Sequence, residues 1–164
     1  MRAVVDTNIL VSGLLHPGSL PAGVLRGIAD RVLTPVVCVE VMAEYAAVLP
    51  RPRLRLRPGD IGDLLAMVEA TADWVHAPLY TGQPPLPDAA DWPFIACALA
   101  AGCPLITGNV RHCPPHLGLT VMTARTWIDF VEGGCSPTGV TQPAGSPSRQ
   151  PECPASILDP QRRF

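Results

Sequence analysis

Short apolar runs alternate with longer stretches of helical spacing along most of the chain. The first run, within Arg2–Asp6, is continuous and β-branched, and polar residues interrupt it at once, which predicts a short buried strand. Further short apolar segments predict strands within Arg31–Val37, at Trp74–Ala77, at Pro104–Gly108 and at Leu119–Met122.

The segments between these strands carry apolar residues at helical spacing. In Ser19–Asp30, for example, Leu20, Val24 and Ile28 share one face, and Ser19 could cap the helix. Comparable patterns predict helices over Val39–Val48, Asp60–Thr71, the segment from Asp91 to Gly102, and Ala124–Val131. Alternating short strands and amphipathic helices predict an α/β fold, a three-layer sandwich whose central, mainly parallel sheet of about five strands is flanked by helices.

The composition changes at Gly133. Beyond it Gly, Pro, Ser, Gln and Thr dominate, and apolar residues are too sparse to build a core. We therefore expect a folded domain over residues 1–132 and a mostly disordered tail over residues 133–164.

Composition excludes some classes of protein and leaves others open. The chain has 164 residues and a formal net charge of -2, so the overall charge does not indicate a nucleic-acid partner. No apolar stretch reaches membrane-spanning length, and Asp6 and Asn8 interrupt what would be the core of a signal peptide. The six cysteines are scattered without a CxxC pair, which favours reduced thiols and a cytoplasmic protein that does not enter the membrane.

Three acidic residues, far apart in the chain, lie within or beside the predicted elements: Asp6, Glu44 and Asp91. Carboxylates that folding brings together repel one another unless a cation lies between them, so a divalent metal site is the sharpest hypothesis. Each residue also has a simpler interpretation. Asp6 could end a strand in a turn, Glu44 could be a solvated helix position that Glu40 could equally fill, and Asp91 could be a helix cap.

The order of these motifs resembles the PIN-domain family. Asp6-Thr7-Asn8 resembles its opening motif, and Ala43-Glu44-Tyr45 its second acidic motif. The stretch from Asp88 to Phe94 before an Ala-rich helix is similar to the third, and Leu105-Ile106-Thr107-Gly108-Asn109 to the closing strand and turn. The resemblance covers Met1 to about Glu132 and is closest to bacterial toxins of toxin–antitoxin pairs, relatives of the VapC-like ribonucleases.

The resemblance implies a Mg²⁺- or Mn²⁺-dependent ribonuclease of PIN-like fold. Asp6, Glu44 and Asp91 would be the acidic catalytic and metal-site residues, with Asp88 as a further possible acid. Thr7, Asn8 and Thr107 would be supporting groups. Many family members carry Asp where Asn109 stands here; the amide can still offer oxygen to a metal, but it brings no charge. An activated water would attack phosphorus in line and leave 5′-phosphate and 3′-hydroxyl ends.

RNA binding requires positive charge near this site. The candidates are Arg51, Arg53, Arg55 and Arg57, which would lie on one side if their segment were extended, together with Arg111 and His112. His112 could bind a phosphate or a metal-bound water. The alternatives are a solubilising surface loop for the arginines and a solvent-exposed loop position for His112.

Two rival functions are weighed against the nuclease. A catalytically weak PIN-fold nucleic-acid-binding protein would explain Asn109, whereas the presence of Asp6, Glu44 and Asp91 counts against it. A phosphoryl hydrolase or transferase with an aspartyl nucleophile would usually carry a second Asp two residues on, where Asn8 stands. By resemblance, the expected partners are an RNA substrate, a small antitoxin protein and a second copy of the chain in a homodimer.

Overall fold

The computed structural model of the chain describes residues 1–79, 86–113 and 117–133. The strands are β1 (Arg2–Val5), β2 (Thr34–Val37), β3 (Asp73–Trp74), β4 (Leu105–Ile106) and β5 (Val121–Met122). The α-helices are α1 (Thr7–Leu15), α2 (Leu20–Ala29), α3 (Val39–Val48), α4 (Pro58–Thr71), α5 (Trp92–Ala101) and α6 (Ala124–Gly133). Short 3₁₀ helices lie at η1 (Pro52–Leu54), η2 (Ala89–Asp91) and η3 (Val110–His112).

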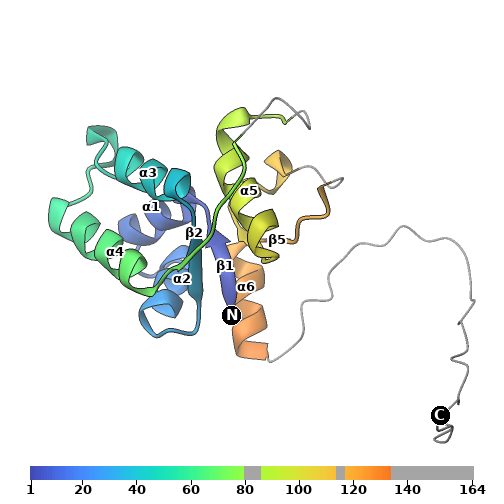
Figure 1. Cartoon of the computed structure of the whole chain (residues 1–164). Helices are drawn as coiled ribbons and strands as arrows, with labels where there is room; N and C mark the ends of the chain where they lie inside the picture. Colours follow the sequence, from blue (N-terminus) through green and yellow to red (C-terminus); the bar gives the residue numbers. More distant parts are fainter. Residues whose placement is uncertain (80–85, 114–116, 134–164) are drawn as a thin grey trace, which may run out of the picture.

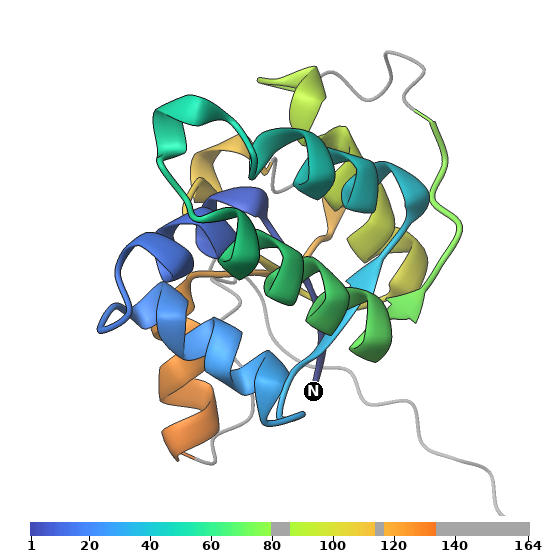
Figure 2. The same cartoon turned by 90° about the vertical axis from the view of Figure 1, so that its left-hand side faces the viewer.

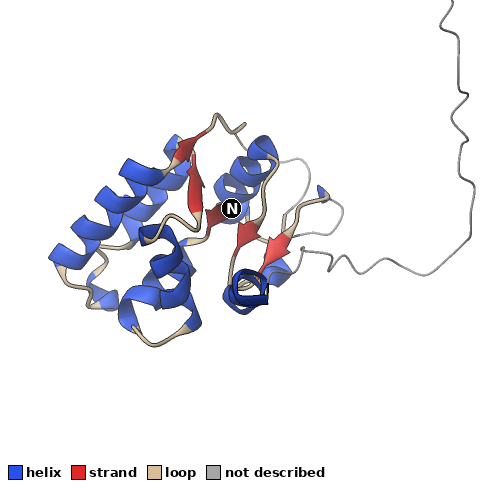
Figure 3. Cartoon of the chain, turned by 90° about the horizontal axis from the view of Figure 1, so that it is seen from below, coloured by secondary structure: helices blue, strands red, loops and turns tan. Residues whose placement is uncertain are grey.

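The strands form one five-stranded sheet in the order β3-β2-β1-β4-β5, and every neighbouring pair is parallel. Helices cover both faces: α1 to α4 lie on one side of β1 and β2, and α5 packs on the other side (Figure 1). Figure 2 views the layer of α1 to α4 from the front, and Figure 3 shows the strands between the helices. The predicted α/β sandwich is confirmed.

Buried apolar strands hold the centre of the sheet. Ala3, Val4 and Val5 of β1 are almost completely buried, as are Leu105 and Ile106 of β4. Strands buried on both faces are expected to be continuously apolar, because helices from both layers pack on them. This explains why the first strand showed no alternation of polar and apolar residues.

The chain order creates a switch point between β1 and β4. From β1 the chain proceeds outward to β2 and β3, and then returns to β4 on the other side of β1. In open parallel sheets, ligand sites form outside the carboxyl ends of the strands at such a point. Residues that directly follow β1 and β4 are therefore the ones that the fold brings to a site.

A glycine lets α6 pack against α2. A Cβ added at Gly27 would lie 2.2 Å from a ring carbon of Trp127, whose side chain is buried. Real Cβ atoms do not approach so closely, so a larger residue at Gly27 would force the two helices apart. The fold thus depends on a small residue at this crossing.

The structure differs from the sequence prediction in four elements: α1 was not predicted, and β3, β4 and β5 are shorter than predicted. Helix α1 starts directly after β1, and the Asp6 side chain caps it by accepting a hydrogen bond from the Asn8 N–H. Strand β3 covers Asp73–Trp74, one residue earlier and shorter than predicted, because only these residues pair with β2. Gly133 belongs to α6, and the rest of the predicted tail, residues 134–164, lies outside the described residues.

Candidate functional site

Asp6 and Thr107 are neighbours because of the register of the two central strands. Val5 pairs with Ile106, and the Asp6 N–H donates to the Ile106 carbonyl at 2.9 Å. The Thr107 hydroxyl donates to Asp6 Oδ2 and accepts from the Asn109 N–H at 2.9 Å. Since Thr107 is buried, its hydroxyl is a fixed link between the Asp6 carboxylate and the turn that carries Asn109.

Asn8 holds the same carboxylate through two further hydrogen bonds. Its N–H donates to Asp6 Oδ1 at 3.1 Å, and its side-chain amide donates to Asp6 Oδ2 at 2.7 Å. The Asn8 side-chain oxygen accepts from the Gly108 N–H at 3.2 Å. Asp6 is therefore a helix cap and also a member of a cluster that joins the ends of β1 and β4. The hydroxyl of Thr7, predicted to be a supporting group, is buried without a hydrogen-bond partner among the described residues.

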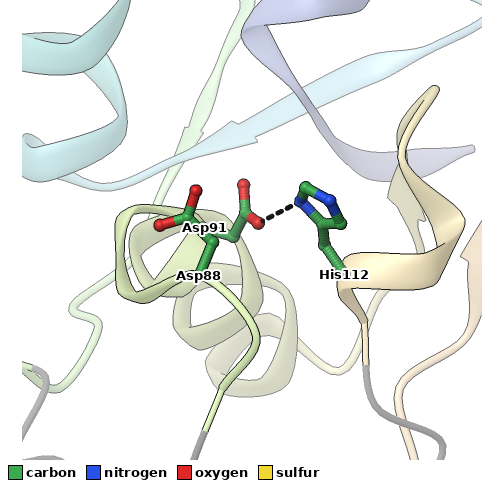
Figure 4. A group of neighbouring side chains, drawn as sticks. All are labelled: Asp88, Asp91 and His112. Atoms are coloured by element: carbon green, nitrogen blue, oxygen red, sulfur yellow. Dashed lines mark hydrogen bonds and ion pairs between the residues drawn. The ribbon is translucent and has the colours of Figure 1, made fainter.

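Asp88, Asp91 and His112 come from two segments that meet at the edge of this cluster. Figure 4 shows the Asp91 carboxylate between Asp88 and the His112 ring, with His112 Nδ1 2.9 Å from Asp91 Oδ2. Asp91 occupies the N-cap position of α5 but makes no side-chain capping bond, so its carboxylate is directed to His112 instead. Asp88 caps η2 by accepting from the Ala90 N–H at 2.9 Å.

One small cavity joins the two groups. Its lining includes Asp6, Asp91, Thr107, Asn109 and His112. The cavity volume is about 10 Å³, close to the smallest that holds a single water molecule. Folding therefore brings Asp6 and Asp91 to one place, as the sequence hypothesis required.

The surroundings of Asp6 disfavour a negative charge on its carboxylate when no cation lies beside it. Burial raises the pKa of Asp6 above its ordinary value of 3.8, and the nearby Asp91 raises it further, while hydrogen bonds from Thr107 and Asn8 act in the opposite direction. Within the described ranges, no arginine forms an ion pair with Asp6 or Asp91. Carboxylate, hydroxyl and amide oxygens around an ion-sized space are a donor set that suits a hard divalent cation.

Glu44 stays a prediction. It is partly buried on α3 and does not line the cavity around Asp6 and Asp91. The next residue, Tyr45, is buried, and its hydroxyl donates to the carbonyl oxygen of Val5, which directly precedes Asp6. The second acidic motif thus reaches the end of β1 through its tyrosine. No role was predicted for Tyr45 itself, because only the fold reveals a hydrogen bond between residues 40 positions apart.

The arginine segment is not extended. Residues Pro52–Leu54 form η1, and Arg55 adopts a left-handed backbone conformation, so alternation in the sequence does not place these side chains on one side. The Arg57 guanidinium pairs with the Asp60 carboxylate through contacts of 2.9 and 3.1 Å. Arg51, Arg53 and Arg55 are exposed, and Arg111 is exposed beside His112 on η3. Their contacts with RNA remain predictions.

Cys113 is a residue of the cavity that the sequence did not reveal. It lines the cavity, and burial raises the pKa of its thiol to about 11, with Asp91 and Asp6 adding to the shift. The four cysteines in the described part of the chain, Cys38, Cys97, Cys103 and Cys113, are free.

A larger cavity of about 350 Å³ lies elsewhere, between α1, α2 and α4, and its lining is mainly apolar, so it offers no comparable chemistry.

Comparison with known proteins identifies the family. A family model described as the PIN domain matches residues 2–111, which is more than half of the chain. The chain therefore belongs to the PIN domain family, whose members are typically metal-dependent nucleases acting on nucleic acids. A search of curated proteins found no match. None of the helices in the described ranges has the length and apolar character needed to cross a bilayer.

Proposed function

We propose that this protein is a divalent-metal-dependent endoribonuclease that hydrolyses RNA phosphodiester bonds. The observation that carries the proposal is the pair of carboxylates, Asp6 and Asp91, in one ion-sized cavity at the switch point of a PIN fold. The raised pKa of Asp6 supports it, since a cation bound beside that carboxylate would offset both its burial and its repulsion from Asp91.

Asp6 and Asp91 would hold the ion, which is Mg²⁺ or Mn²⁺. Asn109 and Asp88 are further candidate ligands, and Glu44 would join them if α3 supplies a carboxylate in the substrate complex. When bound, the ion supplies Lewis acidity, which screens the phosphate charge and makes water a better nucleophile at neutral pH.

The surrounding residues keep this arrangement fixed before substrate arrives. Thr107 and Asn8 together occupy both oxygens of Asp6 with hydrogen bonds, so that side chain has little freedom to turn away. A carboxylate oxygen of Asp91 or Glu44 that is not taken up by the ion would accept a proton from the attacking water. Arg111, which is exposed on η3 next to the cavity residue His112, would contact the RNA backbone.

We also propose that the protein is a toxin restrained by a small antitoxin, and the sequence resemblance supports this role. Induced expression should stop bacterial growth, and the gene beside this one should relieve the arrest if it encodes the antitoxin. The Asp6→Asn variant should not stop growth even when its level matches that of the wild type. Growth arrest by that variant would count against a nuclease toxin.

Cytoplasmic location and a homodimer also belong to this proposal, and light scattering tests the homodimer.

Cleavage of a mixed RNA pool tests the central proposal. The purified protein should cut RNA when Mn²⁺ or Mg²⁺ is added, stop when EDTA is added, and leave 5′-phosphate and 3′-hydroxyl ends. RNA binding without cleavage at any metal concentration would favour the alternative of a catalytically weak nucleic-acid-binding protein, which the neutral Asn109 favours. Cleavage that resists EDTA and persists in Asp6→Asn would contradict the metal-dependent mechanism.

A further inference from the structure

We propose that His112 is a nitrogen ligand of the divalent ion together with Asp88 and Asp91, and that this nitrogen makes the site prefer Mn²⁺ to Mg²⁺. The inference rests on the proposed function, because it requires an ion at this end of the sheet.

The distances between donor atoms fit neighbouring ligands of one ion. For an octahedral ion with ligand bonds of about 2.1 Å, adjacent donor atoms are about 3.0 Å apart and opposite ones about 4.2 Å apart. His112 Nδ1 and Asp91 Oδ2 are 2.9 Å apart, and one ligand atom from each of Asp88, Asp91 and His112 lies within 4.8 Å of the others. An ion could therefore be held by these side chains with only small shifts.

The backbone of both segments sets the approach of these side chains. The His112 N–H donates to the Asn109 carbonyl at 3.0 Å, which closes the turn of η3 and leaves the ring beside Asp91 (Figure 4). Asp88 uses Oδ1 for the Ala90 N–H, and Asp91 gives no oxygen to a capping bond. These contacts lie within each turn and do not join the two segments. The three side chains meet because η3 lies beside the start of α5.

The chemistry of an imidazole ligand sets the expected selectivity. Mg²⁺ favours oxygen donors, whereas divalent transition ions accept imidazole nitrogen more readily, Mn²⁺ the least strongly among them. Two carboxylates and one imidazole would therefore gain more affinity for Mn²⁺ than for Mg²⁺. A neutral imidazole also adds a donor without adding negative charge, and Asn109 likewise brings no charge to the site.

Pulsed electron paramagnetic resonance of bound Mn²⁺ detects this ligand without relying on activity. The samples are RNA-free wild-type protein, His112→Ala, His76→Ala and His116→Ala, each with one equivalent of Mn²⁺. His76 lines a different cavity, together with Glu40, and is a control among the described residues, while His116 lies near His112 in sequence but outside those residues. We expect hyperfine coupling to nitrogen-14 in every sample except His112→Ala.

Calorimetry on the same proteins measures the selectivity. The ratio of the Mn²⁺ and Mg²⁺ affinities should fall roughly tenfold in His112→Ala and stay constant in His76→Ala. Mn²⁺ binding without nitrogen coupling, or coupling that survives in His112→Ala, would overturn the ligand assignment and leave the nuclease proposal intact. Failure of the wild-type protein to bind Mn²⁺ at all would overturn both.

Discussion

The two ends of the parallel sheet treat acidic side chains in opposite ways. At the amino ends of the strands, Asp73 opens β3 and forms an ion pair with Arg2, which opens β1, and both side chains are nearly half exposed. At the carboxyl ends, Asp6 and Asp91 share a small cavity in which burial and the charge of Asp91 disfavour a negative charge on Asp6, and no arginine pairs with either within the described residues.

Only the carboxylates at the carboxyl ends require a positively charged partner from outside the protein. Asp73 is already neutralised by a solvated pair of the kind that contributes little to stability. Asp6 is fixed by hydrogen bonds in a place that disfavours its charge, and such unfavourable arrangements are concentrated at functional sites. The contrast can be tested with matched changes at the two ends.

The largest effect is expected from neutralising one acid at each end. Asp6→Asn should lower the rate of metal-dependent RNA cleavage by roughly 10³-fold, because metal-assisted stabilisation of charge is worth several kcal/mol and about 4 kcal/mol corresponds to that factor. Asp73→Asn, which removes a more exposed carboxylate from the other end, should leave the rate within about twofold of wild type. Equal losses in both variants would show that the effect is structural.

A smaller effect is expected on stability. Tyr45→Phe removes the hydroxyl that donates to the Val5 carbonyl and leaves that buried oxygen unsatisfied, so urea unfolding should show a loss of about 1–3 kcal/mol. Arg2→Gln at the amino end breaks only an exposed ion pair and should cost at most about 1 kcal/mol. A larger loss from Arg2→Gln than from Tyr45→Phe would reverse the ranking of the two ends.

The pH dependence of stability gives a third test in metal-free protein. Since the pKa of Asp6 is raised in the folded state, that state binds the proton more tightly than the unfolded chain. The Asp6 contribution therefore favours folding at pH values below the raised pKa and is lost as pH rises through it. In EDTA, the melting temperature of Asp6→Asn relative to wild type should accordingly rise between about pH 3 and pH 7. A difference that is constant with pH would contradict the shift.

The smallest effect is expected on the alkylation rates of two cysteines, one near each end of the sheet. Burial is the main cause of the raised pKa of Cys113, and Asp91 raises that pKa further. Burial is likewise the main cause of the raised pKa of Cys103, and Asp73 adds to it. Asp91→Asn should therefore speed alkylation of Cys113 at pH 8 by a few-fold and leave Cys103 unchanged, and Asp73→Asn should affect only Cys103. Mass spectrometry of each modified peptide measures both rates, and parallel changes in the two thiols would indicate a global loosening.

Sequence patterns predicted the regular part of this fold well. The helix over Val39–Val48 has the predicted ends, and the Ser19 cap of α2 accepts a hydrogen bond from the Ala22 N–H. Helix α1 escaped prediction because a strand end and a helix cap fall on one residue, Asp6, and the polar Thr7-Asn8 pair obscured the start of a new helix.

The candidate site was predictable only in its residue types. Resemblance to a family pointed to Asp6, Asp91 and the turn at Thr107, whereas the bond between Thr107 and Asp6 follows from a register that spans about a hundred positions. The approach of His112 to Asp91 and the turn of the arginine segment depend on local backbone geometry that periodicity does not encode.

Anomalous scattering from a crystal soaked with Mn²⁺ would locate the ion relative to Asp6 and Asp91. We expect a peak at the carboxyl ends of β1 and β4, about 2.1–2.3 Å from an oxygen of Asp6 or Asp91, and its loss in the Asp6→Asn variant. A wild-type crystal with full Mn²⁺ access and no peak between these two carboxylates would contradict it.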